Sequence, residues 1–338
     1  MYYFCFLTCF ILVAYVCGIR KTVSESEWWF GREFTTCIKG FSILTVIWAH
    51  VGREFGVPAI QFIAGVGVAL FLVCSGYGLE KSFQNNGLKS YWYKRFKTVY
   101  LPFLLALACT TLIGVITRRE FNLKKTIGAL LLVKTNWYLG FIAVCYIAFY
   151  AIKNIIKKMS GKENILWILF IFISFVIYSI FVHSTDAPFL KARQVLSFPM
   201  GILIGKNKSE IEAFLRKNSF KIGILCAFVG VLFMGVTQLH FVKMLPYVIS
   251  NFMSLFTCFP LAICVICIVT NKEWILKNKF LHSVGVISYE LFLVQYFALR
   301  ILDDDLKSQL CFSVVLIVCS IALHKCRNKM IIKKKSAL

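Results

Sequence analysis

Residues 39–50 read K-G-F-S-I-L-T-V-I-W-A-H, an apolar run with a cation at its start and an imidazole at its end. In a helix, steps of about 100° and about 1.5 Å per residue return His50 to within about 20° of Lys39, about 16 Å further along. An ionisable side chain at mid-membrane depth is costly and usually functional. Glu54 falls on nearly the same face and is expected to orient or charge the imidazole. A helix with a snorkelling lysine and an incidental histidine is the structural alternative.

The composition indicates a membrane protein. Of 338 residues, 59% are apolar and 16% charged, and Phe alone accounts for 33. Apolar runs of membrane-spanning length recur, whereas the short alternating segments of a β-barrel are absent, so we expect an all-α, polytopic transmembrane helical bundle. The net charge of +23 comes from Lys and Arg clustered between apolar runs, which indicates loops facing an anionic leaflet rather than nucleic-acid binding.

The 14 cysteines are scattered and lie mostly within apolar runs, where a thiol behaves as a small hydrophobe. Cys264 and Cys267 form a CxxC without a second pair or nearby histidines. We therefore expect no metal site and no disulfide framework.

Eleven membrane helices are expected. Residues 1–19 carry no charge before Arg20, which favours an additional N-terminal membrane helix over a cleaved signal peptide, with a surface-lying helix as the alternative. Trp28 and Trp29 in the following linker are expected to be interfacial anchors. The ten further spans are predicted at 41–55, 60–79, 98–117, 137–152, 164–183, 193–205, 220–240, 245–269, 284–302 and 309–324.

The distribution of basic residues orients these helices. The loops that alternation places on one side, with the C-terminal tail, hold 26 Lys or Arg, so the positive-inside rule makes that side cytoplasmic and leaves the N-terminus outside. The basic segment 118–136 falls on the outer side, as an interfacial segment or a site for an anionic acceptor. We divide the chain into an N-terminal helix with a cytoplasmic linker (1–34), a membrane domain (35–325) and a basic cytoplasmic tail (326–338).

The spacing of Lys39 and His50 resembles the signature of the acyltransferase 3 family of integral membrane proteins, in which a basic residue precedes a histidine by this interval on the first family helix. The family usually has arginine at the first position, and lysine keeps the charge but loses the planar fork. The resemblance implies ten membrane helices and transfer of an acyl group, commonly acetyl from cytoplasmic acetyl-CoA, to an acceptor at the cell envelope. It implies that residues 35–325 form a membrane acyltransferase domain.

Two further stretches carry the resemblance on the cytoplasmic side. In the glycine-rich run 65–78, Ser75, Gly76 and Tyr77 match the family's F-x-x-S-G-[FY], although close helix packing explains small residues equally well. The aromatic and basic loop 91–102 resembles the family's R-x-x-R…P stretch, with Arg95 and Pro102 matching. All six residues in this group are implied to bind the donor, the cations by holding the phosphates of CoA, whereas a snorkelling belt is the alternative; they are Ser75, Gly76, Tyr77, Lys94, Arg95 and Lys97.

Elements near the other side are implied to face the acceptor. Trp137 and Tyr138 resemble the family's W-[FY]-L, and interfacial anchoring is the alternative. Residues 288–295 resemble S-Y-x-x-[YF]-L-x-H, with Gln295 in place of the histidine. Glu290 and Arg300 in this helix are functional or pair with a neighbouring helix. Residues 198–201 resemble a weaker family element at a short helix.

The function expected is that of an integral membrane acyltransferase, an O-acetyltransferase acting on a hydroxyl of a cell-envelope glycan or its lipid-linked precursor. His50 is the expected general base, with Lys39 supporting the donor or developing charge and Glu54 supporting the imidazole. Acetyl-CoA is a co-substrate, and no bound cofactor is expected. The expected partners are the acyl-CoA donor, the sugar acceptor and the lipid bilayer. The alternative is an exporter of a glycan or lipid-linked intermediate, in which His50, Glu290 and Arg300 would line a permeation path.

Overall fold

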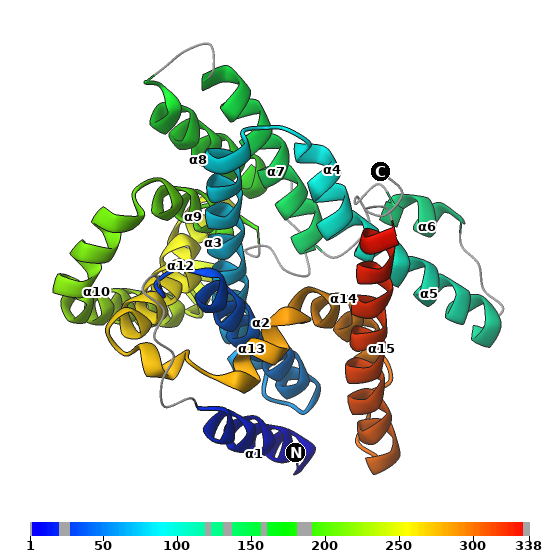
Figure 1. Cartoon of the computed structure of the whole chain (residues 1–338). Helices are drawn as coiled ribbons and strands as arrows, with labels where there is room; N and C mark the ends of the chain where they lie inside the picture. The colour runs from blue at the N-terminus through cyan, green and yellow to red at the C-terminus, as the bar shows by residue number, and fades with distance from the viewer. Residues whose placement is uncertain are drawn as a thin grey trace. The chain divides into compact units, whose positions relative to one another are not determined.

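The computed structural model describes residues 2–19, 28–118, 123–130, 137–156, 161–180 and 191–333. These residues are almost entirely helical (Figure 1), and the one extended pairing among them is an antiparallel bridge between Ile19 and Asn278. The helices are α1 (Tyr2–Gly18), α2 (Arg32–Glu54), η1 (Pro58–Ile60), α3 (Gln61–Asn86), α4 (Tyr91–Arg95), η2 (Phe96–Tyr100), α5 (Leu101–Arg118), α6 (Leu123–Leu130), α7 (Trp137–Ile156), α8 (Glu163–Ile180), η3 (Ala192–Gln194), α9 (Ser197–Lys206), α10 (Lys208–Val236), α11 (His240–Lys243), α12 (Tyr247–Asn271), η4 (Glu273–Ile275), α13 (Lys279–Val286), α14 (Ser288–Ala298) and α15 (Leu306–Lys333).

The all-α, polytopic fold class is confirmed. Among the described helices, seven are long and apolar enough to cross a membrane, or eight if the pair α13–α14, bent by 72°, counts as one span. The predicted span 193–205 is instead a 3-10 turn followed by α9, whose ten residues cover only about 15 Å of a hydrocarbon core about 30 Å thick. The chain is therefore a multi-pass membrane protein with fewer long spans in its described part than the apolar runs predicted.

The described residues form two compact units. Unit 1 comprises Met1–Gly87 and Cys145–Val286, and unit 2 comprises Leu88–Val144 and Ile287–Leu338. Several predicted features fall wholly or partly outside the described residues, including 20–27 of the linker, 119–122 and 131–136 of the basic outer segment, and 334–338 of the tail.

Several predicted positions differ from the structure, and the start of α10 at Lys208, twelve residues before the predicted span 220–240, is one of them. Helix α2 begins nine residues before the predicted span, because Phe34, Cys37 and Ile38 continue its buried face at helical spacing. Trp28 and Trp29, predicted as interfacial anchors, are 4% and 1% exposed and belong to the core of unit 1. At the other end, α15 extends to Lys333, so most of the predicted tail is helical.

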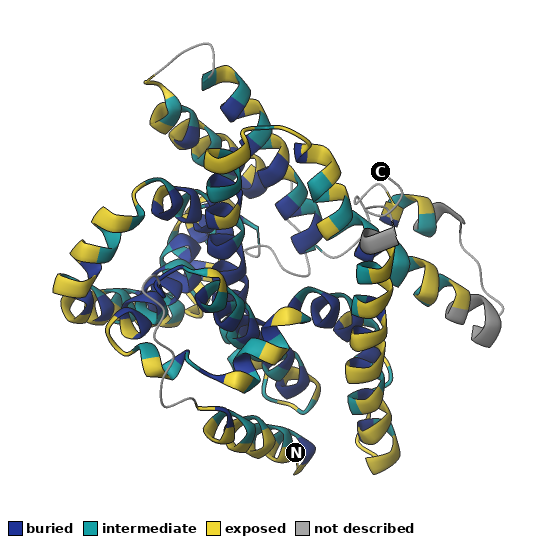
Figure 2. Ribbon diagram, viewed as in Figure 1, coloured by how far each residue is buried: buried dark blue, intermediate teal, exposed yellow. Residues whose placement is uncertain are grey.

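The helices of unit 1 differ sharply in burial (Figure 2). In the most apolar window of the Pro58–Asn86 segment 67% of residues are buried, and in that of α12 61%, whereas α10 has 17%. The exposed side chains of α10 are large and apolar, among them Phe220, Leu225 and Phe228. An apolar helix with an exposed apolar face is what contact with lipid requires, so α3 and α12 form the core and α10 faces the bilayer.

Helices α3 and α9 approach each other at their backbones. A Cβ added to Gly76 would meet the carbonyl oxygen of Phe198, and one added to Gly201 would meet the carbonyl oxygen of Val73. Small residues let membrane helices pack this closely, and the contact then stabilises the pair by dispersion. The packing interpretation of the glycine-rich run therefore holds at Gly76.

We expect Gly76→Ala to destabilise the protein by about 1–3 kcal/mol, because the new methyl group overlaps the backbone of α9. Gly78→Ala is the matched control on the same helix, since nothing lies within 4 Å of a Cβ at that position. The control should be neutral or more stable by about 0.5–1 kcal/mol, as alanine is the better helix former. Thermal unfolding in detergent measures both, and equal melting temperatures for the two variants would contradict the close contact.

Four charged side chains connect α3, α7, α8 and α9 inside unit 1. Lys153, 2% exposed, places its Nζ 2.7 Å from Glu80 Oε2 and 2.7 Å from Glu163 Oε1. Lys206 Nζ lies 2.8 Å from Glu163 Oε2. Phe83 and Phe149 flank the buried ammonium, with ring centroids 4.5 and 5.5 Å from Nζ. Lys153 is thus a buried partner of two carboxylates, although the charge count had assigned it to a cytoplasmic loop.

Replacing Lys153 by Met should destabilise the protein by about 3–5 kcal/mol, because it leaves two carboxylates without their shared cation. Adding Glu80→Gln to that variant should restore part of the loss, since it removes one of the uncompensated charges. Chemical unfolding of the two single variants and the double variant gives the coupling energy. Strictly additive losses would show that Lys153 and Glu80 do not interact.

Candidate active site

The predicted signature lies on one continuous helix. Both Lys39 and His50 are within α2, which is unbroken over 23 residues, so they share a face as the spacing requires. Each of the two side chains is half-buried, whereas Ala49 and Val51 on either side of the histidine are fully buried. The structure thus confirms the helix on which the catalytic prediction rests, and the roles of the two residues stay predictions.

Helix α3 brings the second motif to this helix. A Cβ added to Gly67 of the glycine-rich run would meet the carbonyl oxygen of Ser42, three residues after Lys39, so this run packs against the part of α2 that carries the first signature residue. At the other end of α2, the side-chain amide of Gln61 donates a 2.7 Å hydrogen bond to the carbonyl oxygen of Ala49, next to His50. Two motifs about thirty residues apart in sequence therefore meet along α2 and α3.

The third residue of the predicted catalytic set has another partner. Glu54 ends α2, is exposed, and accepts two hydrogen bonds at Oε1 from Arg53, of 2.6 and 3.1 Å. Arg53 therefore pairs with this carboxylate at the surface, and the imidazole of His50 is not needed as its partner. The support that Glu54 was expected to give to His50 stays a prediction that the geometry does not favour.

In unit 2, the predicted donor-binding cations are on helical turns and not on a loop. Helix α4 is followed by the π-helical turn η2 and then by α5, so Lys94, Arg95 and Lys97 line a nearly continuous helical segment. Pro102 has no N–H to donate and its ring opposes the preceding turn, which explains the wider turn there. Lys97 Nζ lies 4.4 Å from the ring centroid of Tyr93. Donor binding by these cations stays a prediction.

Unit 2 also brings three of the sequence motifs together. The hydroxyl of Tyr289, in the S-Y-E-L-F stretch, donates a 2.9 Å hydrogen bond to the carbonyl oxygen of Val99 in the basic segment. The ring of Phe292, from the same stretch, stacks edge-on against Tyr138 with centroids 4.9 Å apart. Helix α14 therefore connects the basic segment to the W-Y-L element, which begins α7 at Trp137 as predicted.

Gln295 is the least satisfied polar side chain of α14. Its side chain is 1% exposed, and neither the amide nitrogen nor the amide oxygen has a hydrogen-bond partner in the structure described. Burying an unpaired amide costs about 1–3 kcal/mol. A ligand with both a donor and an acceptor would satisfy it, as expected of a residue that faces an acceptor hydroxyl.

The pairing alternative is confirmed for Glu290. Its fully buried Oε1 lies 2.6 Å from Nη1 of Arg327 and 3.3 Å from Nδ1 of His324, both on α15. Asn328 Nδ2 lies 2.9 Å from Nε2 of the same histidine. The sequence alone did not indicate this cluster, because Arg327 falls in the predicted tail and His324 at the end of the last predicted span. The spacing of His324 and Arg327, one turn apart on an apolar helix, was the available signal.

A protein-family model described as an acyltransferase domain matches residues 33–324. The chain belongs to the acyltransferase 3 family. A search of curated proteins and a search of solved structures gave no significant match. The match begins within one residue of the start of α2 and therefore leaves α1 outside the family domain.

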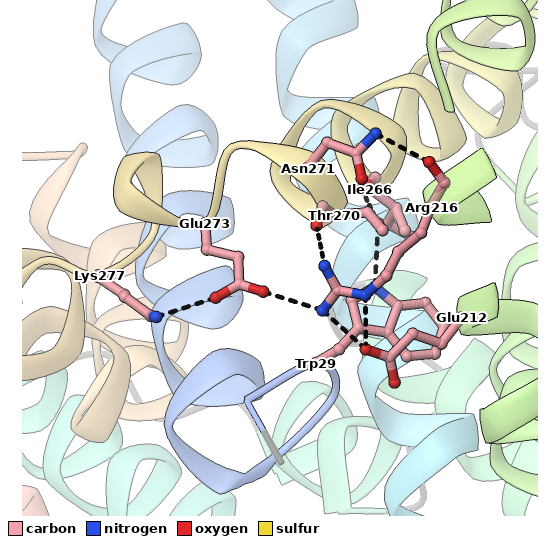
Figure 3. Close-up of polar contacts among 8 residues, drawn as sticks. All are labelled: Trp29, Glu212, Arg216, Ile266, Thr270, Asn271, Glu273 and Lys277. Atoms are coloured by element: carbon pink, nitrogen blue, oxygen red, sulfur yellow. Dashed lines mark hydrogen bonds and ion pairs between the residues drawn. The ribbon is translucent and has the colours of Figure 1, made fainter. Parts of the chain in front are cut away.

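In this acyltransferase, the densest polar cluster of unit 1 is closed on itself (Figure 3). Arg216 of α10 donates to Glu212, to Glu273 and to the backbone of Thr270, at 2.8, 2.9 and 3.2 Å. Thr270 in turn accepts a 2.9 Å bond from the indole of Trp29. Because these groups bond one another, the cluster holds α10, α12 and the residues just before α2 together.

The carboxyl of Glu273 gives the cluster a pH dependence. Burial alone would raise its pKa, but the hydrogen bonds from Lys277 and Arg216 outweigh burial and hold the pKa below its usual value. A carboxyl with a lowered pKa in the folded protein stabilises it fully above the unfolded pKa and loses that contribution as the pH falls through the folded pKa.

We therefore expect Glu273→Gln to lower the melting temperature at neutral pH and to have a much smaller effect at about pH 3. Glu210→Gln is the control, since Glu210 is an exposed carboxylate in the first turn of α10. Melting curves of wild type and both variants across this pH range measure the effect. A loss for Glu273→Gln that is constant with pH would contradict the titration.

Proposed function

We propose that this membrane acyltransferase moves an acetyl group from cytoplasmic acetyl-CoA to a hydroxyl of a cell-envelope glycan or a lipid-linked glycan precursor. The match over residues 33–324 is the observation that carries the acyltransferase part of the proposal. It favours an enzyme over the exporter. The proposal that acetyl moves from acetyl-CoA to a hydroxyl is supported by the chemistry of α2, on which a cation and an imidazole share one face.

The proposed step is attack of an acceptor hydroxyl on the thioester carbonyl. His50 removes the hydroxyl proton as the new C–O bond forms, the C–S bond breaks, and the proton passes from the imidazole to the departing CoA thiolate. No atom is left over, since the products are the acyl ester, free CoA thiol and neutral His50. The step requires the neutral imidazole, which is the form that accepts a proton.

The spacing along α2 constrains how the donor lies. Lys39 and His50 are separated by about 16 Å of helix, so they cannot act on the same atom of a substrate. An elongated donor must lie along the face of α2, with its thioester near His50 and its charged portion toward Lys39. CoA has this shape and charge distribution, because its phosphates are far from its thiol. Lys94, Arg95 and Lys97 are proposed to bind those phosphates as a cluster of cations.

The acceptor side is proposed from Trp137, Tyr138 and Gln295. The half-buried indole of Trp137 offers a flat apolar face to a sugar ring, with Tyr138 packed on Phe292 beside it, and the buried amide of Gln295 can both donate to and accept from a hydroxyl. We propose that the basic side faces the cytoplasm and that the N-terminus is outside, from the positive-inside rule. The acceptor would then reach the site from the side opposite to CoA.

The first test is turnover of acetyl-CoA by purified protein in detergent, with free CoA measured by mass spectrometry because the chain itself has 14 thiols. His50→Ala should lower the rate by about 10²–10⁴-fold, the usual contribution of a general base, while its melting temperature is unchanged. His240→Ala is the matched control, because His240 is an exposed histidine of unit 1 outside the proposed site.

Each outcome has a distinct meaning. Loss of turnover in His50→Ala alone supports the proposed base. Undiminished turnover in that variant would contradict the role of His50 but not the acyltransferase activity. No turnover and no CoA binding by the wild type would contradict acetyl-CoA as the donor.

A further inference from the structure

An apolar pocket of about 490 Å³, open on one side, lies in unit 1 between α1, α2, α12 and α13. Its walls include Ile11 and Leu12 of α1, Leu44 and Trp48 of α2, and Val265 and Ile268 of α12. Closely packed helices leave few spaces larger than a water molecule, so an apolar pocket of this size is a candidate site for an apolar ligand.

The hydroxyl and indole donors of the wall are already used within the protein. The hydroxyls of Thr8 and Thr45 each donate to a carbonyl of their own helix at 2.7 Å, and the hydroxyl of Tyr15 donates to the carbonyl of Ile275 at 2.8 Å. The indole of Trp48 donates to the hydroxyl of Thr8 at 2.8 Å. Apolar cavities whose polar groups are already satisfied stay dry and take apolar ligands. The occupant must therefore be hydrocarbon.

The pocket lies behind the signature helix. Phe41, Leu44 and Trp48 line it from α2, and their directions cluster about 180° from Lys39, whereas His50 lies within about 20° of Lys39. An acyl group on its way to His50 would be on the other face of α2. The occupant is therefore not the group being transferred.

Helix α1 forms one wall of the pocket and is fixed near both of its ends. Near the N-terminal end, the ring of Phe4 lies 5.1 Å from that of Trp48. Near the C-terminal end, the backbone carbonyl of Tyr15 accepts a 2.7 Å hydrogen bond from the side-chain amide of Asn278. Helix α1 precedes the residues that match the family, whereas α2, α12 and α13 lie within or at the edge of the match. The wall that α1 forms is therefore additional to the walls that the family domain supplies.

The bilayer is the source of hydrocarbon at hand. The outer face of α1 consists of exposed apolar side chains, including Phe6, Phe10 and Val13, which is the face expected of a helix in contact with lipid. We propose that α1 holds a hydrocarbon chain of a bilayer lipid in this pocket, and that the bound chain supports α2 from the side opposite to Lys39 and His50. Filling the pocket restores dispersion contacts that its walls otherwise lack.

The test is the lipid content of the purified full-length protein after detergent exchange, measured by native mass spectrometry and by lipid extraction. Wild type should retain a lipid, and Ile11→Trp should lose it because the indole fills the pocket. Val13→Trp, the same substitution on the exposed face of α1, should retain it. Leu44→Trp narrows the pocket from α2 and keeps the test decisive if Ile11→Trp does not fold.

Adding back phosphatidylcholine to delipidated protein supplies a second measurement. The melting temperature of wild type and of Val13→Trp should rise with lipid concentration, whereas that of the filled variants should not. A wild type without retained lipid, or filled variants that retain as much as wild type, would overturn the proposal. Neither measurement needs turnover, so the outcome is independent of the acyl-transfer proposal.

Discussion

The arrangement of unit 1 depends on the close approach of α3 to its neighbours on two faces. Gly67 faces the backbone of α2 at Ser42, and Gly76 faces the backbone of α9 at Phe198, about half a turn away around α3. Membrane helices gain nothing from hiding apolar surface from water inside a bilayer, so contact area and dispersion decide how they pack. Small residues on opposite faces of one helix let α3 serve as the shared partner of two others.

This packing fixes the helix on which the proposed chemistry takes place. With α3 held against α2, Gly67 packs on the backbone of Ser42, three residues after Lys39, and Gln61 bonds the backbone next to His50. The face of α2 that carries both signature residues is thereby fixed at two levels along the helix. The opposite face of α2 borders the pocket of which α1 forms one wall, so one helix separates the proposed reaction path from the proposed lipid.

Charge has two different uses in this chain. Most of the Lys and Arg cluster between apolar runs, and the positive-inside rule predicts that such loops face an anionic leaflet. Lys153, Arg216 and Arg327 instead lie in helices and bond carboxylates from distant parts of the sequence. A buried ion is tolerated only with its partners in place, so these pairs specify which helices are neighbours more than they add net stability.

The sequence by itself determined the class of the fold and the family. Apolar runs of spanning length can form only helices or closed barrels in a bilayer, and the spacing of Lys39 and His50 places both on one face of a helix that the structure confirms. It also located the starts of α3 and α7 to within one residue, because turn residues and an aromatic pair mark them.

Only the tertiary structure decided which residues meet. The contacts of Tyr289 with Val99 and of Lys153 with Glu80 join residues far apart in the chain, and nothing in local spacing specifies such a pairing. Burial of Trp28 and Trp29 likewise depends on which helix covers them, since an indole suits an interface and a core equally well. Hydropathy reports that a side chain avoids water, and only packing determines whether lipid, a neighbouring helix or a ligand takes the place of water.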